Sequence, residues 1–98
     1  MNEEEHILSC LAEECNEIGK NVSKALRFGL SDWGPGKSLN NAQAIRYEFL
    51  DLVAVMELLI SRGILERTSE VDEGLAKQAK KEKVLQYIEV AKKLGTIT

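Results

Sequence analysis

Residues 8–25, LSCLAEECNEIGKNVSKA, carry the pattern that decides the fold of this 98-residue chain. Apolar residues recur there at alternating steps of three and four: Leu8, Leu11, Cys15, Ile18, Val22 and Ala25. This spacing is typical of an amphipathic helix that buries one stripe of its surface. The pattern predicts a helix from about residue 4 to residue 28.

Two further stretches have the composition of helices. Residues 41–62 are apolar almost all round after Phe49, which predicts a helix buried on several sides. Residues 75–95 predict a third helix, whose apolar positions we expect to face inward: Val84, Tyr87, Ile88, Ala91 and Leu94. Glycine and asparagine cluster between the first two helices, at about residues 29–40, and predict a helix stop, a loop and a new N-cap.

These elements predict an all-α fold, an antiparallel helical bundle without a sheet. The length of 98 residues suits one domain, residues 1–98. A domain of this size buries only part of the surface that its unfolded chain exposes. We therefore expect a second copy to complete a four-helix type of packing, in a homodimer or homotetramer.

Charge and composition restrict the classes of function. Thirteen basic residues against sixteen acidic ones leave a net charge of -3, which argues against a protein that neutralises a nucleic-acid backbone. The first residues, MNEEEHIL, are acidic where a secretory signal would be basic, and no apolar run approaches the roughly 18 residues of a membrane span. We expect a cytoplasmic protein with no nucleic-acid and no membrane partner.

Four carboxylates form two pairs with helical spacing. Glu14 and Glu17 share a narrow strip beside the apolar stripe of the first helix, because residues three apart lie on one face. Glu48 and Asp51 share a face of the most apolar segment of the chain, where unpaired burial would be costly. If the two helices are antiparallel neighbours, the four side chains converge, and their repulsion calls for a hard cation such as Mg²⁺ or Mn²⁺.

A simpler interpretation competes with this one. Glutamates on an amphipathic helix commonly form a solvated face, and the EECNE segment alone is explained well in that way. The interpretation fits Glu48 and Asp51 less well, because their helix has little polar surface on which to place two charges.

The EECNE segment (Glu13, Glu14 and Glu17) followed by EFLD (Glu48 and Asp51) resembles a family signature. It is similar to the E-E-x-x-E then E-x-x-D motif of the MazG-like, all-α nucleoside triphosphate pyrophosphohydrolases. The surrounding segments SKALRFGL and LDLVAVMELL resemble small phage and bacterial members, so the resemblance covers about residues 8–60.

The resemblance implies a function. Members of the family hydrolyse a (d)NTP to a (d)NMP and pyrophosphate by means of a metal-activated water. By position, Glu14, Glu17, Glu48 and Asp51 resemble the metal ligands, with Mg²⁺ as the implied cofactor and Mn²⁺ as a possible substitute. Glu13 would act in catalysis by orienting or deprotonating the attacking water, or would bind an additional ion.

Further residues could contact the nucleotide substrate. They are Asn21, Lys24, Arg27, Phe28, Trp33, Lys80, Lys83 and Tyr87. The cations would meet phosphates, the amide would bind the ribose or base, and an aromatic ring would stack on the base. Each also has a simpler interpretation as a solvated lysine, a surface amide, a core ring or a loop anchor.

The main alternative function is not catalytic. The chain could be a helical oligomerisation or adaptor protein whose carboxylates are surface charges or hold a structural cation. A response of the melting temperature to Mg²⁺ and nucleotide would separate the two, because a bundle without a site should ignore both.

Overall fold

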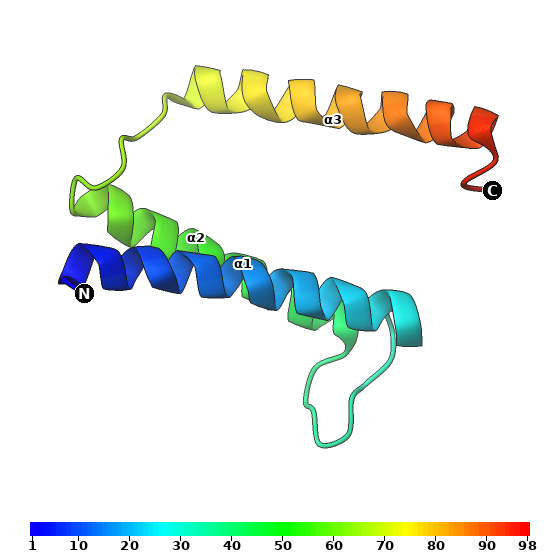
Figure 1. The fold of residues 1–98 in the computed structure, drawn as a ribbon, viewed down its shortest axis with the longest axis horizontal. Coiled ribbons are helices and arrows are strands. Elements are labelled where there is room, and N and C mark those ends of the chain that lie inside the picture. The colour runs from blue at the N-terminus through cyan, green and yellow to red at the C-terminus, as the bar shows by residue number, and fades with distance from the viewer. The chain divides into compact units, whose positions relative to one another are not determined.

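The computed structural model describes residues 1–98 and is entirely helical, without a sheet. Its helices are α1 (Glu3–Phe28), α2 (Asn41–Ser61) and α3 (Glu70–Leu94) (Figure 1). The chain divides into two compact units, Met1–Glu66 with α1 and α2, and Arg67–Thr98 with α3. None of the helices combines the length and the apolar character that crossing a membrane requires. The all-α prediction is confirmed, and completion of a four-helix bundle by a second copy stays a prediction.

Local signals determine both ends of α1. The Asn2 side chain accepts a hydrogen bond from the Glu5 backbone N–H at 2.8 Å, which caps the first turn. The helix ends before Gly29, whose φ of 99° is a conformation that glycine adopts without strain. These bounds agree with the predicted helix to within one residue at each end.

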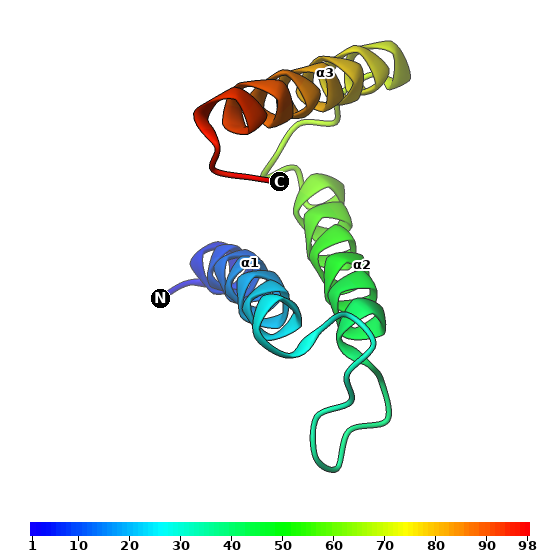
Figure 2. The ribbon, with the colours of Figure 1, turned by 90° about the vertical axis from the view of Figure 1, so that its right-hand side faces the viewer.

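A capping box begins α2. The Asn40 side chain accepts from the Gln43 backbone N–H at 2.8 Å, and the Gln43 side chain accepts from the Asn40 backbone N–H at 3.0 Å. The helix then runs back along α1 in the opposite direction, and the two pack against each other (Figures 1 and 2). Facing acidic residues on α1 and α2 can therefore approach one another.

The core of the α1–α2 unit is small. Ile7 and Leu59 are its buried apolar side chains. The expectation that α2 is buried on several sides is wrong for this unit, because Phe49, Leu50 and Leu58 stay between 43% and 44% exposed. One neighbouring helix covers one stripe of α2, whereas its apolar residues extend around more of the surface.

The third helix begins at Glu70, whereas the sequence pattern predicted a start at residue 75. The Ser69 side chain accepts from the Asp72 backbone N–H at 3.1 Å and caps the helix. Acidic residues in the first turn favour the same start, since negative charge stabilises a helix N-terminus. The capping signal was present in the sequence, and the prediction overlooked it.

The 29–40 loop is held at its neck by hydrogen bonds. Ala42 N–H donates to the Leu30 carbonyl and Asn41 N–H to the Asp32 carbonyl, both at 2.9 Å. The buried Asn41 side chain donates from Nδ2 to the Gly29 carbonyl, also at 2.9 Å. These bonds tie the neck of the loop to the first turn of α2.

The tip of the loop contains a tight turn, GPGK, at residues 34–37. Lys37 N–H donates to the Gly34 carbonyl at 3.0 Å, and Gly36 has a φ of 71°. A type II turn requires a residue with positive φ at its third position, here Gly36, and commonly has proline at its second. The loop therefore has a defined conformation at both its neck and its tip.

Candidate metal centre and adjoining cavity

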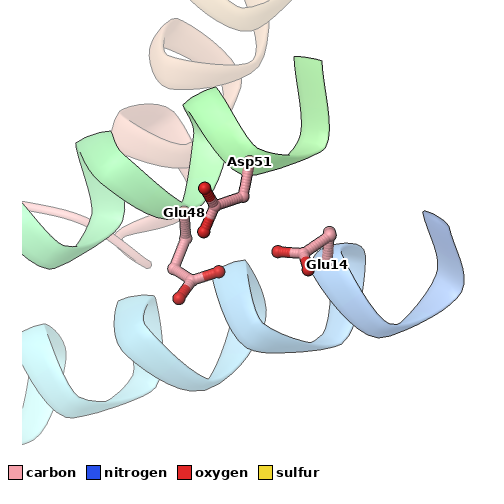
Figure 3. A group of neighbouring side chains, drawn as sticks. All are labelled: Glu14, Glu48 and Asp51. Carbon is pink, nitrogen blue, oxygen red and sulfur yellow. The ribbon is translucent and has the colours of Figure 1, made fainter. Parts of the chain in front are cut away.

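Three carboxylates meet between α1 and α2 (Figure 3). Glu14 comes from α1, and Glu48 and Asp51 come from α2; one oxygen of each lies within 4.8 Å of the others. Glu14 and Glu48 are half-buried, and Asp51 is exposed. We call these three residues the carboxylate trio. The predicted meeting of the two acidic faces is thus observed for three of the four proposed ligands.

No cationic side chain neutralises the trio. The ion pairs of the structure join other residues. The Glu14 Oε2 atom is buried and has no hydrogen-bond partner. A buried charged oxygen without a partner is costly, so the arrangement favours a bound cation or an added proton.

The pKa of Glu48 reports this crowding. Burial of the carboxyl raises its pKa above the ordinary value, and the adjacent Glu14 carboxyl raises it further. The charges of Glu14, Asp51 and Glu17 act in the same direction. A proton on Glu48 would remove one of the negative charges that crowd Glu14. Proton binding and cation binding are therefore alternative ways to relieve the same repulsion.

The donor set fits a hard divalent cation. Carboxylate oxygens are the ligands that Mg²⁺ and Mn²⁺ prefer, and the trio contains no histidine or cysteine, which zinc favours. A cation held by Glu14, Glu48 and Asp51 would supply the missing partner of Glu14 Oε2. The exposed position of Asp51 leaves one side of the trio open to solvent or substrate.

The other two acidic residues of the motif lie outside the trio. Glu17 follows Glu14 on α1 by one turn, is exposed, and is near enough for its charge to raise the pKa of Glu48. Glu13 is exposed and projects about 100° around the helix from Glu14. The structure thus places Glu17 beside the trio, and the catalytic role of Glu13 stays a prediction.

A cavity of about 500 Å³ lies between the second half of α1, the 29–40 loop and the start of α2, and no residue of the trio lines it. Its volume lies in the range typical of small-molecule sites. Three predicted substrate contacts line it, namely Asn21, Lys24 and Phe28. On α2 the cavity reaches Ala44, one helical turn before Glu48.

The other predicted substrate contacts lie elsewhere. The guanidinium of Arg27 stacks over the Phe28 ring, 5.2 Å from its centroid, and does not line the cavity. Trp33 forms a β-bridge with Asn40, is 55% exposed and is also not part of the lining. The remaining three belong to α3 in the second unit: Lys80, Lys83 and Tyr87. Their contact with a nucleotide stays a prediction.

Sequence reasoning did not identify Asp32 and Lys37 as cavity residues. Both lie in the 29–40 loop, whose path depends on backbone hydrogen bonds at the neck. The GPGK turn was a readable signal for the tip, but no local pattern shows that the loop borders the end of α1.

Comparison of the chain with protein-family models, with curated proteins and with solved structures finds no match. The resemblance to MazG-like hydrolases therefore depends on the motif residues themselves, and the relationship stays a hypothesis.

Proposed function

We propose that this chain is a metal-dependent nucleoside triphosphate pyrophosphohydrolase, which converts a (d)NTP to a (d)NMP and pyrophosphate. The observation that carries the proposal is the carboxylate trio. Side chains from two helices bring three acidic groups within 4.8 Å without any cationic partner. Such an arrangement is costly unless a cation binds, and a metal-dependent phosphoryl site uses that cation.

The reaction needs little covalent chemistry from the protein. A water oxygen attacks the α-phosphorus, the bond from this phosphorus to the oxygen bridging to the β-phosphorus breaks, and pyrophosphate leaves with the electron pair. When bound, a divalent ion would neutralise phosphate charge and lower the pKa of a water molecule. The trio would hold the ion, with Glu17 beside it completing the ligands, and Glu13 would orient the water or accept its proton.

The cavity supports a nucleotide substrate. Its lining reaches Ala44, one helical turn before Glu48 of the trio, and a nucleoside triphosphate is long enough to extend over that separation. Lys24 offers a positive charge, Asn21 an amide and Phe28 an aromatic ring, which are the groups that bind phosphates, ribose and bases. The proposed substrate class follows from the trio and this lining together.

Release of pyrophosphate from a panel of NTPs and dNTPs, with Mg²⁺ or Mn²⁺, tests the proposal. We expect the native protein to release pyrophosphate together with the monophosphate. Glu48→Gln should lower the rate about 100-fold or more, because it removes one of the carboxylates that would hold the divalent ion. Glu57→Gln is the matched control, since Glu57 is an exposed glutamate of the same helix outside the trio, and it should keep its rate. Failure of the native protein to hydrolyse any triphosphate would overturn the proposal.

A non-catalytic oligomerisation protein is the second candidate, and the exposed apolar residues favour it. Leu26, Phe28, Tyr47 and Leu58 of the α1–α2 unit are between 43% and 83% exposed. Covering such side chains with a second copy would stabilise a homodimer or homotetramer. Self-association in sedimentation, together with no hydrolysis and no effect of Mg²⁺ on the melting temperature, would favour this candidate over the enzyme.

A further inference from the structure

The lining of the cavity suits a nucleoside better than a pyrophosphate group. Phe28, Pro35, Leu39 and Ala44 give it apolar walls. A pyrophosphate carries several charges and has no apolar surface to bury, so these four side chains give it no favourable contact and only Lys24 and Lys37 would attract it. A base and a ribose have flat or weakly polar faces that gain from such contacts.

The position of the cavity leads to the same assignment. Cleavage at the α-phosphorus requires this atom to lie at the trio, and the nucleoside is attached to the α-phosphate directly. On α2, Ala44 precedes Glu48 by four residues, so the cavity begins about 6 Å along the helix from the trio. On α1, Asn21 follows Glu14 by seven residues, or about 10 Å, and Glu17 lies between them. A nucleoside in the cavity would therefore place its α-phosphate beside the trio.

Three charged residues line the cavity, and none forms an ion pair. Two are cations, Lys24 and Lys37, and Asp32 is the one carboxylate. Asp32 lies in the neck of the loop, where its carbonyl accepts from Asn41 N–H at 2.9 Å. Its backbone is therefore tied to the start of α2, which fixes the place of this residue in the lining.

The bases differ in what they offer to a carboxylate, which can only accept hydrogen bonds when ionised. Guanine presents N1–H and the N2 amino group side by side, matching the two oxygens of a carboxylate, and its O6 and N7 accept from lysine. Adenine and cytosine present an amino group next to an acceptor nitrogen. Uracil and thymine present one N–H between two carbonyl oxygens. A carboxylate that accepts from this N–H brings its second oxygen against one of these carbonyl oxygens, and the two repel. A site with a carboxylate and a lysine therefore matches guanine best.

We propose that the cavity is the nucleoside subsite and that Asp32 makes it selective for guanine. The inference rests on the proposed hydrolase function, whose substrate it specifies. In this arrangement Phe28 lies against the base, Asp32 accepts from N1–H and the N2 amino group, and a lysine of the cavity donates to O6 or N7. Asp32 is then a specificity-determining residue that takes no part in the bond-breaking step.

Steady-state kinetics with dGTP, dATP, dCTP and dTTP test the selectivity. We expect kcat/KM to be highest for dGTP, by about tenfold or more over dTTP, as for one paired set of base hydrogen bonds. Asp32→Asn should lower the preference for dGTP about tenfold, mainly through KM, because its amide NH₂ would face the N2 amino group. Values for dATP and dTTP should change little, and Glu57→Gln should leave the whole profile unchanged. Equal use of all four triphosphates, or an equal effect of Asp32→Asn on all of them, would overturn guanine selection while leaving the hydrolase intact.

Binding without metal gives a second readout, independent of turnover. We expect GMP, added to the metal-free full chain, to shift the NMR amide signals of Gly34 and Asn41, and AMP to shift them only at higher concentration. Asp32→Asn should remove this difference. If pyrophosphate alone shifts these signals and GMP does not, the cavity is not a nucleoside subsite and the inference fails. If GMP binds there but no triphosphate is hydrolysed, the subsite is supported and the hydrolase proposal is overturned.

Discussion

Two acidic clusters of this chain look alike in sequence and differ in their surroundings. Glu3, Glu4 and Glu5 fill the first turn of α1, and all three are exposed. They complement the partial positive charge of a helix N-terminus, and Glu3 also accepts a hydrogen bond from Arg62 at 3.0 Å. The carboxylate trio has neither compensation, and one of its oxygens is buried without a partner.

The number of acids in a segment therefore says little about their role. An exposed acid at a helix start is stabilised where it is, and it needs no ligand. The trio needs a bound cation or proton, because the neighbouring carboxylates and the burial of Glu48 both disfavour its ionised form. The following experiments change one cluster or the other, and the first two use a residue of the exposed cluster as their control.

Removing one trio carboxylate should have the largest effect. We expect Glu14→Gln to lower pyrophosphate release about 100-fold or more, because its oxygen faces both α2 carboxylates. Glu4→Gln, in the exposed cluster of the same helix, should change the rate less than about twofold. Equal losses in the two variants would show that the clusters are functionally alike, contrary to the comparison.

Mg²⁺ should stabilise the native chain through the trio. At a concentration 100 times its dissociation constant, a ligand that binds only the folded state adds about 2.7 kcal/mol to the free energy of unfolding. We expect an increase of this kind in chemical denaturation of the native chain and of Glu4→Gln. Asp51→Asn should lose most of it, and an undiminished response in Asp51→Asn would place the ion elsewhere.

The raised pKa of Glu48 predicts a pH effect of definite sign in the absence of metal. Because the folded state holds the proton more tightly than the unfolded state, the folded state is favoured while Glu48 is protonated. This stabilisation is fully present below the ordinary pKa of glutamate and is lost as the pH rises through the raised value. Glu48→Gln, which is always neutral, should lack this loss.

The measurement is the melting temperature of both proteins in EDTA at pH 4 and pH 7. From pH 4 to pH 7, we expect the melting temperature of Glu48→Gln to rise relative to that of the native chain. Mg²⁺ in excess of EDTA should restore the melting temperature of the native chain at pH 7. A parallel pH dependence of the two proteins would mean that Glu48 does not titrate in the way its surroundings imply.

Much of the fold could be predicted from local sequence signals. The bounds of α1 and α2 follow from apolar periodicity and from caps at Asn2 and Asn40, which act within one turn. The meeting of Glu14 with Glu48 and Asp51 was also predictable, because spacing and antiparallel packing are enough to place them.

Features that depend on distant parts of the chain could not be predicted. Burial of α2 depends on how many other helices cover it, and apolar periodicity within one helix does not predict that number. The cavity depends on the path of the 29–40 loop, which is determined by hydrogen bonds from Asn41 and Ala42 to loop carbonyls. Asp32 and Lys37 therefore had no sequence signal of their own as cavity residues.

The smallest effect is expected in the exposed cluster. Glu3→Gln removes the ion pair with Arg62, whose side chains are 87% and 47% exposed respectively. Exposed pairs of this kind contribute little, since solvent screens the charges and two flexible side chains must be ordered, so the free energy of unfolding should fall by about 0.5 kcal/mol or less. Raising the salt concentration should reduce even this difference, because dissolved ions screen the attraction between the two charges. A loss of several kcal/mol from Glu3→Gln would mean that the first turn of α1 is coupled to the packing of α2 as strongly as the trio is, and the contrast between the two clusters would then not hold.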